Sequence, residues 1–306
     1  MATRFELVLH GDNPVALRAA GEEALDEVAR LENQLSLYRP GSEIAQLNAR
    51  AAREAVQVSP ELFDLLQHAQ RLYAETDGAF DITIAPLVRC WGFVNNQGKM
   101  PSTEAIAAAR ELVGMHLVQL EASKRTVRFV RAGVMLDLGA IGKGYAVERG
   151  AELLREAGVT SALFHGGTST VCAIGYPPDA ATWRVAVESP PDGFGDFSFP
   201  ELPLVQLTDE SLSVSAVWGR HFRADGRNFG HVIDPRTGQP VEGAWLSAVV
   251  LPTATETDAF STALLTLSSP GLERLAGLRS GLKAMLVSRA VGLESNSAWG
   301  PVAVRR

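Results

Sequence analysis

The sequence has few of the features that mark disulfide-stabilised or membrane-spanning proteins. Its 306 residues include only two cysteines, Cys90 and Cys172, which excludes a disulfide framework and a CxxC zinc pattern. Two free thiols are the expected state, and a single disulfide is the alternative. The longest apolar runs, such as residues 244–251, are too short to cross a bilayer, so no integral membrane segment is expected.

Positive charge is not concentrated in any segment of the chain. The chain has no block of lysine and arginine, and its formal net charge is −7, so a nucleic-acid partner is not expected. In the first ten residues Glu6 and His10 interrupt the apolar residues, and no small-residue cleavage site follows, unlike a signal peptide. We therefore expect a cytoplasmic location, or a periplasmic one if a leader has been removed. The same stretch predicts a strand with Phe5, Leu7 and Leu9 on one face.

The most distinctive segment is residues 134–148, which reads VMLDLGAIGKGYAVE. A short apolar run, a glycine-rich turn with Lys143 and a helical pattern predict a strand, loop and helix junction. Such a junction points backbone N–H groups and a positive helix end at one place, where phosphate binds. The same spacing also fits a turn whose lysine faces solvent. Neither GxxxxGK[ST] nor GxGxxG is present.

The remaining pattern predicts helices and antiparallel hairpins. Helices are expected from Asn13-Pro14 to about Ser36, from Ser59-Pro60, from Ser102 to Gly114 and from the glycine turn to about Gly158, with a hairpin over 117–130. Residues 190–203 are rich in Pro, Gly and Asp and predict an exposed excursion. Together these elements indicate an α/β fold, with mixed sheets flanked by helices, in a single domain over residues 1–306.

Two loops contain side chains that suit either packing or ligand contact. Residues 37–44 form a turn-rich loop around Tyr38, which by itself fits a packing role. Asp77 and Asp81 flank Gly78, Ala79 and Phe80, and by themselves fit a simple turn.

A histidine and a carboxylate occur together in residues 230–240. His231 stands three residues before Asp234, which begins an Asp-Pro-x-Thr-Gly turn. Histidine titrates near neutral pH, so this pair is a candidate general base with a neighbouring acid. The alternative is a structural histidine at the end of a hairpin.

Asp258 and Thr262 are four residues apart in a segment that opens a helix, so both side chains lie on one face. Thr255 and the acidic residues after it give the segment a helix-capping pattern. A carboxylate and a hydroxyl are hard oxygen donors that suit Mg²⁺. The alternative is a helix cap and a threonine that bonds the preceding turn.

Taken together, these blocks resemble the ApbE family of FAD:protein FMN transferases. The similar blocks occur in order along nearly the whole chain, at residues 1–3, 37–43, 77–81, 137–145, 166–167, 231–235 and 258–262. The resemblance implies the flavin transferase fold of that family. It also implies Mg²⁺ bound by the Ala140 carbonyl, Asp258 and Thr262, and His231 as the base with Asp234 near it. The residues it implies around FAD are Met1, Tyr38, Ala79, Phe80, Asp81, Asp137, Lys143 and Ile233.

The implied reaction transfers FMN from FAD to a Thr or Ser hydroxyl of an acceptor flavoprotein and releases AMP. Three single positions and one block depart from the family habit: Ala2, Glu148, Thr168 and the block 214–216. Those at 168 and 214–216 are expected to weaken acceptor or flavin binding without removing metal or base. Two alternatives are an FAD pyrophosphatase, with water as nucleophile, and an FAD-binding protein without turnover. Tyr38 favours transfer, because an aromatic ring can stack on flavin and shield the phosphate from water.

Overall fold

The chain forms two compact units. The computed structural model describes residues 3–95, 98–190 and 199–299. Unit 1 consists of Met1–Glu32, Ile141–Ala216 and Gly243–Arg306, and unit 2 of Asn33–Ala140 and Val217–Glu242. The predictions for Met1 and for most of the excursion at 190–203 lie outside the described residues. Each unit is built from separate stretches of chain, and the single domain over 1–306 stays a prediction.

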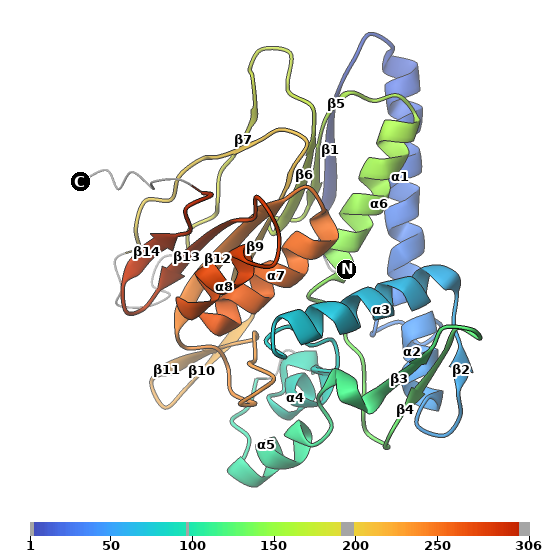
Figure 1. Ribbon diagram of the computed structural model, residues 1–306, viewed down its shortest axis with the longest axis vertical. Coiled ribbons are helices and arrows are strands. Elements are labelled where there is room, and N and C mark those ends of the chain that lie inside the picture. The colour runs from blue at the N-terminus through green and yellow to red at the C-terminus, as the bar shows by residue number, and fades with distance from the viewer. Residues whose placement is uncertain (1–2, 96–97, 191–198, 300–306) are drawn as a thin grey trace. The chain divides into compact units, whose positions relative to one another are not determined.

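Unit 1 is built on a seven-stranded sheet, with the order β1-β5-β6-β9-β12-β13-β14 (Figure 1). Its strands are β1 (Phe5–His10), β5 (Ser161–Gly166), β6 (Thr170–Ile174), β9 (Ser211–Ala216), β12 (Ala244–Leu251), β13 (Lys283–Ser288) and β14 (Gly292–Ser295). Every described pairing in this sheet is antiparallel. A separate pair joins β7 (Trp183–Val185) to β8 (Val205–Leu207). Strand β12 lies inside the sheet and is buried along nearly its whole length.

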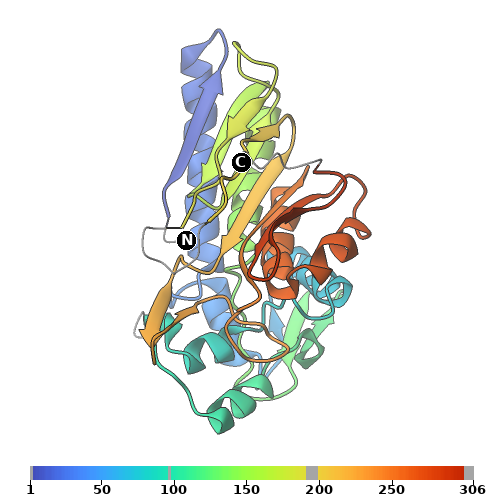
Figure 2. The same ribbon diagram turned by 90° about the vertical axis from the view of Figure 1, so that its left-hand side faces the viewer.

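The helices of this unit cover the sheet. Helices α6 (Gly142–Glu156) and α7 (Ala254–Leu267) lie side by side against strands β6, β9 and β12 (Figures 1 and 2). Helix α8 (Pro270–Ala276) follows α7, and α1 (Pro14–Leu35) packs its Gly21 against leucines of β1. The predicted start of α1 is confirmed, because Ala16 N donates to Asn13 Oδ1 at 3.1 Å.

Unit 2 combines short helices with a small sheet and a hairpin (Figure 1). Its helices are α2 (Glu43–Arg50), α3 (Pro60–Glu75), α4 (Ala85–Cys90), η1 (Phe93–Asn95), α5 (Thr103–Arg110) and η2 (Met115–Leu117). Its strands are β2 (Val56–Gln57), β3 (Val118–Glu121), β4 (Thr126–Phe129), β10 (His221–Ala224) and β11 (Arg227–Gly230). Trp91, Phe229 and Ile233 belong to its hydrophobic core. The indole Nε1 of Trp91 donates to the Gly238 carbonyl at 2.8 Å, which fastens the 234–238 turn to α4.

Most of the predicted local structure is confirmed. Ser59 and Ser102 cap α3 and α5, since each hydroxyl accepts from an N–H three residues later. The hairpin over 117–130 is β3 and β4. Helix α2 was not predicted, because eight residues show little of the 3.6-residue period. The predicted loop at 37–44 therefore ends at Ser42, which caps α2 by accepting from Ala45 N at 3.0 Å.

The prediction of a strand at 134–138 is wrong. These residues belong to no strand, and backbone groups of Leu136 and Asp137 bond elsewhere. Leu136 N donates to Asn48 Oδ1 at 2.8 Å, Asn48 Nδ2 donates to Leu136 O at 2.9 Å, and Asp137 N donates to Ile82 O at 2.7 Å. One asparagine side chain thus takes the place of a neighbouring strand.

Cys90 and Cys172 are both free thiols, as expected. Over residues 3–95, 98–190 and 199–299, no helix combines the length and the apolarity needed to cross a membrane.

Candidate functional site

In unit 1, the start of α6 meets the first turns of α7. Gly144 N donates to Asp258 Oδ2 at 2.9 Å, and Lys143 Nζ lies 3.5 Å from Asp258 Oδ1. The Asp258 side chain is only 4% exposed and the Lys143 side chain 24%. A buried carboxylate needs such partners, because leaving it uncompensated is strongly destabilising. Lys143 and Asp258, far apart in the sequence, therefore form an ion pair whose carboxylate is buried.

Glycine at position 144 is what allows this approach. A Cβ there would lie 2.1 Å from the Ala254 carbonyl oxygen and 2.7 Å from Asp258 Cβ. Both are positions that real Cβ atoms do not occupy, so α6 and α7 touch backbone to backbone at this point.

Thr262 lies one turn after Asp258 on α7. Its hydroxyl donates to the Asp258 carbonyl at 3.4 Å, the bond to the preceding turn that the sequence allowed as an alternative. The same hydroxyl is 3.2 Å from Ser215 Oγ on β9, and Ser215 Oγ is 2.9 Å from Ser261 Oγ. In the block 214–216, only residues 214 and 216 depart from the family habit, and the hydroxyl of Ser215 supports Thr262.

The prediction that α7 is capped by residues of its own segment is wrong. The helix begins at Ala254, and the side chain of its N-cap residue Thr253 makes no capping hydrogen bond. Thr255 N donates instead to Glu148 Oε2 of α6 at 2.8 Å. Asp258, expected to contribute to a capping pattern, has its carboxylate turned to Gly144.

In unit 2, His231 follows directly after β11 and is partly exposed. Its main-chain N donates to the Arg220 carbonyl at 2.9 Å, and its Nδ1 lies 3.1 Å from the same oxygen. The Phe93 ring meets the imidazole edge on, with centroids 6.5 Å apart. A strand end, a carbonyl and an aromatic ring thus orient the imidazole.

Asp234 closes the turn that follows. Its carboxylate accepts from Arg236 N at 2.9 Å, Arg236 Nε at 2.9 Å and Arg236 Nη2 at 2.8 Å, and its carbonyl accepts from Gly238 N at 2.7 Å. The Asp234 carboxylate raises the pKa of the Arg236 guanidinium. These contacts show a turn-forming role for Asp234, and its predicted role beside the base stays a prediction.

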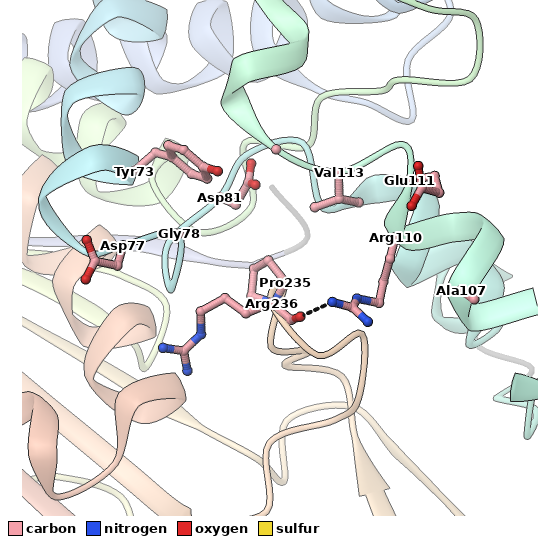
Figure 3. Close-up of a pocket in the computed structure, with 11 residues that line it drawn as sticks. Tyr73, Asp77, Gly78, Asp81, Ala107, Arg110, Glu111, Val113, Pro235 and Arg236 are labelled. Carbon is pink, nitrogen blue, oxygen red and sulfur yellow. Dashed lines mark hydrogen bonds between the residues drawn. The ribbon is translucent and has the colours of Figure 1, made fainter.

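A cavity of about 340 Å³ lies in unit 2 beside the 77–81 loop. Its lining includes Tyr73, Gly78, Asp81, Arg110, Pro235 and Arg236. Figure 3 shows Asp81 and Tyr73 together on one side, with Pro235 and Arg236 facing them. Arg110 Nη2 donates to the Arg236 carbonyl at 2.6 Å, which holds the facing segment to α5.

Asp81 is the buried acid of this cavity. Its Oδ1 accepts from Thr83 N at 2.7 Å and from Thr83 Oγ1 at 2.6 Å. Burial raises the pKa of Asp81 to about 6, although both bonds from Thr83 oppose that shift. The cavity therefore contains a carboxyl group that changes protonation state close to neutral pH.

Comparison with known proteins identifies the family. The sequence profile of the ApbE family matches residues 1–286. This chain belongs to the ApbE family. It is 31% identical over 287 residues to a protein of Klebsiella pneumoniae (strain 342) named FAD:protein FMN transferase, covering 92% of this chain and 79% of that protein. The fold agrees with that assignment and confirms the α/β class.

Two solved structures of ApbE proteins are similar to this chain. The ApbE protein of Thermotoga maritima has a TM-score of 0.86 and 26% sequence identity, covering 97% of this chain and 94% of that one. The apo form of the flavinyl transferase ApbE of Pseudomonas stutzeri has a TM-score of 0.81 and 30% identity, covering 96% and 91%. The predicted fold of the ApbE family is therefore confirmed.

The residues predicted from the ApbE resemblance divide between the units. Lys143, Asp258 and Thr262 lie together in unit 1. Those in unit 2 are Tyr38, Ala79, Phe80, Asp81, Asp137, Ala140, His231, Ile233 and Asp234. Tyr38 is 54% exposed, whereas Phe80 and Ile233 are buried. Ala140 is the last residue of its unit, three residues before Lys143.

The oxygen donors on α7 suit the Mg²⁺ that the ApbE resemblance implies. Within the described residues, His, Cys, Asp and Glu side chains form no group of three that could hold a metal. A site here would therefore need other oxygens, such as a hydroxyl, a carbonyl and phosphate. Asp258 and Thr262 supply hard donors of that kind. The donor set fits a divalent ion.

Sequence reasoning noted Glu148 only as a departure from family habit and missed its partner. The sequence did show that Glu148 and Gly144 are four residues apart and therefore share one face of the helix. No local pattern could indicate that this face meets α7.

Proposed function

We propose that this chain is an FAD:protein FMN transferase, which moves the FMN half of FAD to a Thr or Ser hydroxyl of an acceptor flavoprotein. The ion pair between Lys143 at the start of α6 and the buried Asp258 carboxylate is the observation that carries the proposal. It provides a cation and a potential metal-binding carboxylate where a helix begins, which suits a pyrophosphate. The names of the ApbE relatives support the same reaction.

In unit 1, Lys143 offsets negative charge on the pyrophosphate. Asp258 and Thr262, with the Ala140 carbonyl, are the proposed ligands of Mg²⁺. When bound, Mg²⁺ would neutralise charge on the phosphate oxygens as the bridging bond breaks. The hydroxyls of Ser215 and Ser261 orient Thr262 for this role.

In unit 2, His231 is the proposed base. It takes the proton of the acceptor hydroxyl as that oxygen bonds to the phosphorus of the FMN half. The bond from that phosphorus to the bridging oxygen breaks, and AMP leaves with the electron pair. Asp234 is proposed near the base, where its bonds to Arg236 keep the 234–238 turn closed.

The proposed contacts to FAD are Met1, Tyr38, Ala79, Phe80, Asp81, Asp137, Lys143 and Ile233. The cavity beside Gly78 and Asp81 supports part of this set, because it offers a volume next to residues 79–81. An exposed Tyr38 ring is available to stack on flavin.

One assay tests the proposal against its two rivals. The protein is incubated with FAD, Mg²⁺ and a candidate acceptor flavoprotein, and AMP release and acceptor mass are followed. AMP together with an acceptor heavier by one FMN supports the transferase. AMP without the adduct indicates a pyrophosphatase, and no AMP indicates an FAD-binding protein without turnover.

A further inference from the structure

The start of α7 depends on another helix for its cap. The first N–H groups of any helix lack intrahelical partners. Thr253 and Glu256 have the spacing of a capping box, but the Thr253 side chain makes no capping bond and Glu256 accepts two bonds of 2.8 Å from Arg279. Glu148 of α6 supplies the acceptor, because its Oε2 lies 2.8 Å from Thr255 N. A carboxylate is also the group that the positive end of a helix favours.

This cap is one half of a reciprocal exchange between two helices. The α6 carboxylate of Glu148 accepts from an α7 amide, and the α7 carboxylate of Asp258 accepts from the α6 amide of Gly144. Gly144 and Glu148 are four residues apart and Thr255 and Asp258 are three apart, so each pair lies on one helix face. Two bonds about one turn apart fix both the sliding and the rotation of α7 against α6.

We infer that Glu148 is a positioning residue that sets the Asp258 carboxylate for the divalent ion. The inference rests on the proposed function, since it assigns Asp258 as a metal ligand. Rotation of α7 would move Asp258 away from Gly144 and Lys143 and would move Thr262 with it. Removing the Glu148 acceptor therefore weakens metal binding without deleting a ligand, as second-sphere partners commonly do.

The test compares Glu148→Met, which removes the acceptor at similar length, with Glu148→Gln, which keeps an acceptor oxygen without charge. Glu152→Gln is the matched control, because Glu152 lies one turn further along α6, is partly exposed and pairs with Arg149. In Glu148→Met, we expect the Mg²⁺ concentration for half-maximal AMP release to rise about 10-fold. Glu148→Gln should give a smaller rise and Glu152→Gln none. AMP release at saturating Mg²⁺ should stay within about 2-fold of wild type.

Two further readouts do not depend on turnover. With FAD present, the rise in melting temperature caused by Mg²⁺ should shrink in Glu148→Met. In metal-free protein, amide hydrogen exchange at Thr255 and Gly144 should quicken in Glu148→Met and remain unchanged in Glu152→Gln. A cap that only stabilises the fold would lower the melting temperature equally with and without Mg²⁺.

An unchanged Mg²⁺ dependence in Glu148→Met, or an equal change in Glu152→Gln, overturns the inference. If Glu148→Met does not fold by circular dichroism, the comparison of Glu148→Gln with Glu152→Gln decides it by the same criteria. If the wild type itself shows no Mg²⁺ response, the proposed function fails. The metal-positioning role then falls with it, while the exchange data still report on the contact between Glu148 and Thr255.

Discussion

The two units each bury an aspartate, and they surround it differently. In unit 1, Asp258 has an amide donor on one oxygen and the Lys143 ammonium near the other. In unit 2, Asp81 accepts from the amide and hydroxyl of Thr83, which are neutral donors. Burial raises the pKa of Asp81 to about 6, and the two bonds from Thr83 oppose that rise only in part. The aspartate of unit 1 thus suits cation binding, and the aspartate of unit 2 suits a change of protonation state.

The backbone that supports the candidate residues differs as well. Unit 1 places Lys143, Asp258 and Thr262 on two helices that bond to each other. Unit 2 places His231 and Asp234 after a strand and in a turn. We therefore expect substitutions in unit 1 to disturb the metal response and the stability together. Substitutions in unit 2 should act on proton transfer or on pH dependence.

The largest effect is expected from His231→Ala. Loss of a general base should slow AMP release by about 100-fold to 10 000-fold, while the Kd for FAD changes little. AMP release and FAD fluorescence titration measure the two quantities. His221→Ala on β10 is the control, since His221 is exposed and has no proposed role. Turnover at the wild-type rate in His231→Ala would show that His231 is not the base.

Asp258→Ala tests the other side of the comparison. It should lower AMP release by about 100-fold or more at a fixed Mg²⁺ concentration and abolish the response to added Mg²⁺. A Mg²⁺ titration of AMP release measures this, with the exposed carboxylate of α8 as control in Glu273→Ala. A variant that still responded to Mg²⁺ like the wild type would show that the metal assignment is wrong.

Asp81→Asn should remove a pH dependence of stability. Because the pKa of Asp81 is raised from 3.8 to about 6, the native state holds a proton between these values that the unfolded state releases. Its stabilising contribution is complete below about pH 3.8 and is lost as the pH rises through about 6. The difference amounts to about 3 kcal/mol, from roughly two pKa units at 1.4 kcal/mol each.

Urea unfolding of wild type and Asp81→Asn between pH 3.5 and 7 measures this difference, at pH values spaced by about half a unit across the window in which the carboxyl titrates. The variant should gain on the wild type as the pH rises, because its amide does not titrate. Asp64→Asn on the exposed face of α3 is the control. Parallel curves for wild type and Asp81→Asn would mean that the buried carboxyl does not titrate in this range.

The smallest effect is expected from Gly144→Ala. The added Cβ meets the Ala254 carbonyl and Asp258, and overpacking of this kind costs about 1–3 kcal/mol. Alanine's better helix propensity offsets about 1 kcal/mol of that cost. Gly41→Ala, where a Cβ would have no neighbour within 4 Å, is the control for the free energy of unfolding. Equal stability changes in the two variants would show that α6 and α7 do not need this close approach.

Local features could be read from the sequence, because their partners lie within a few residues. The caps at Asn13, Ser59 and Ser102 are of this kind. Asn48 bonding Leu136 and Glu148 bonding Thr255 could not be read, since both need two distant segments to be placed first. The capping pattern at α7 misled for the same reason, because tertiary partners took its carboxylates.

The candidate site was predicted unevenly. A glycine turn with a lysine indicated anion binding at the start of α6, and the helix and its lysine are where the pattern placed them. Residue type and spacing made His231 a candidate base and Asp258 and Thr262 candidate metal donors, and the family resemblance favoured these roles over the structural alternatives. The roles of His231, Asp258 and Thr262 stay predictions, which the experiments above test.

The bond between the Trp91 indole and the Gly238 carbonyl gives this protein a native optical probe. The 231–238 segment has His231 at one end and Arg236, which lines the cavity, close to the other. Indole emission is sensitive to its hydrogen bond, so displacement of this segment by a bound molecule would change the colour or intensity of Trp91 fluorescence. With the other four tryptophans replaced by phenylalanine, that single emitter would report movement of the segment in real time.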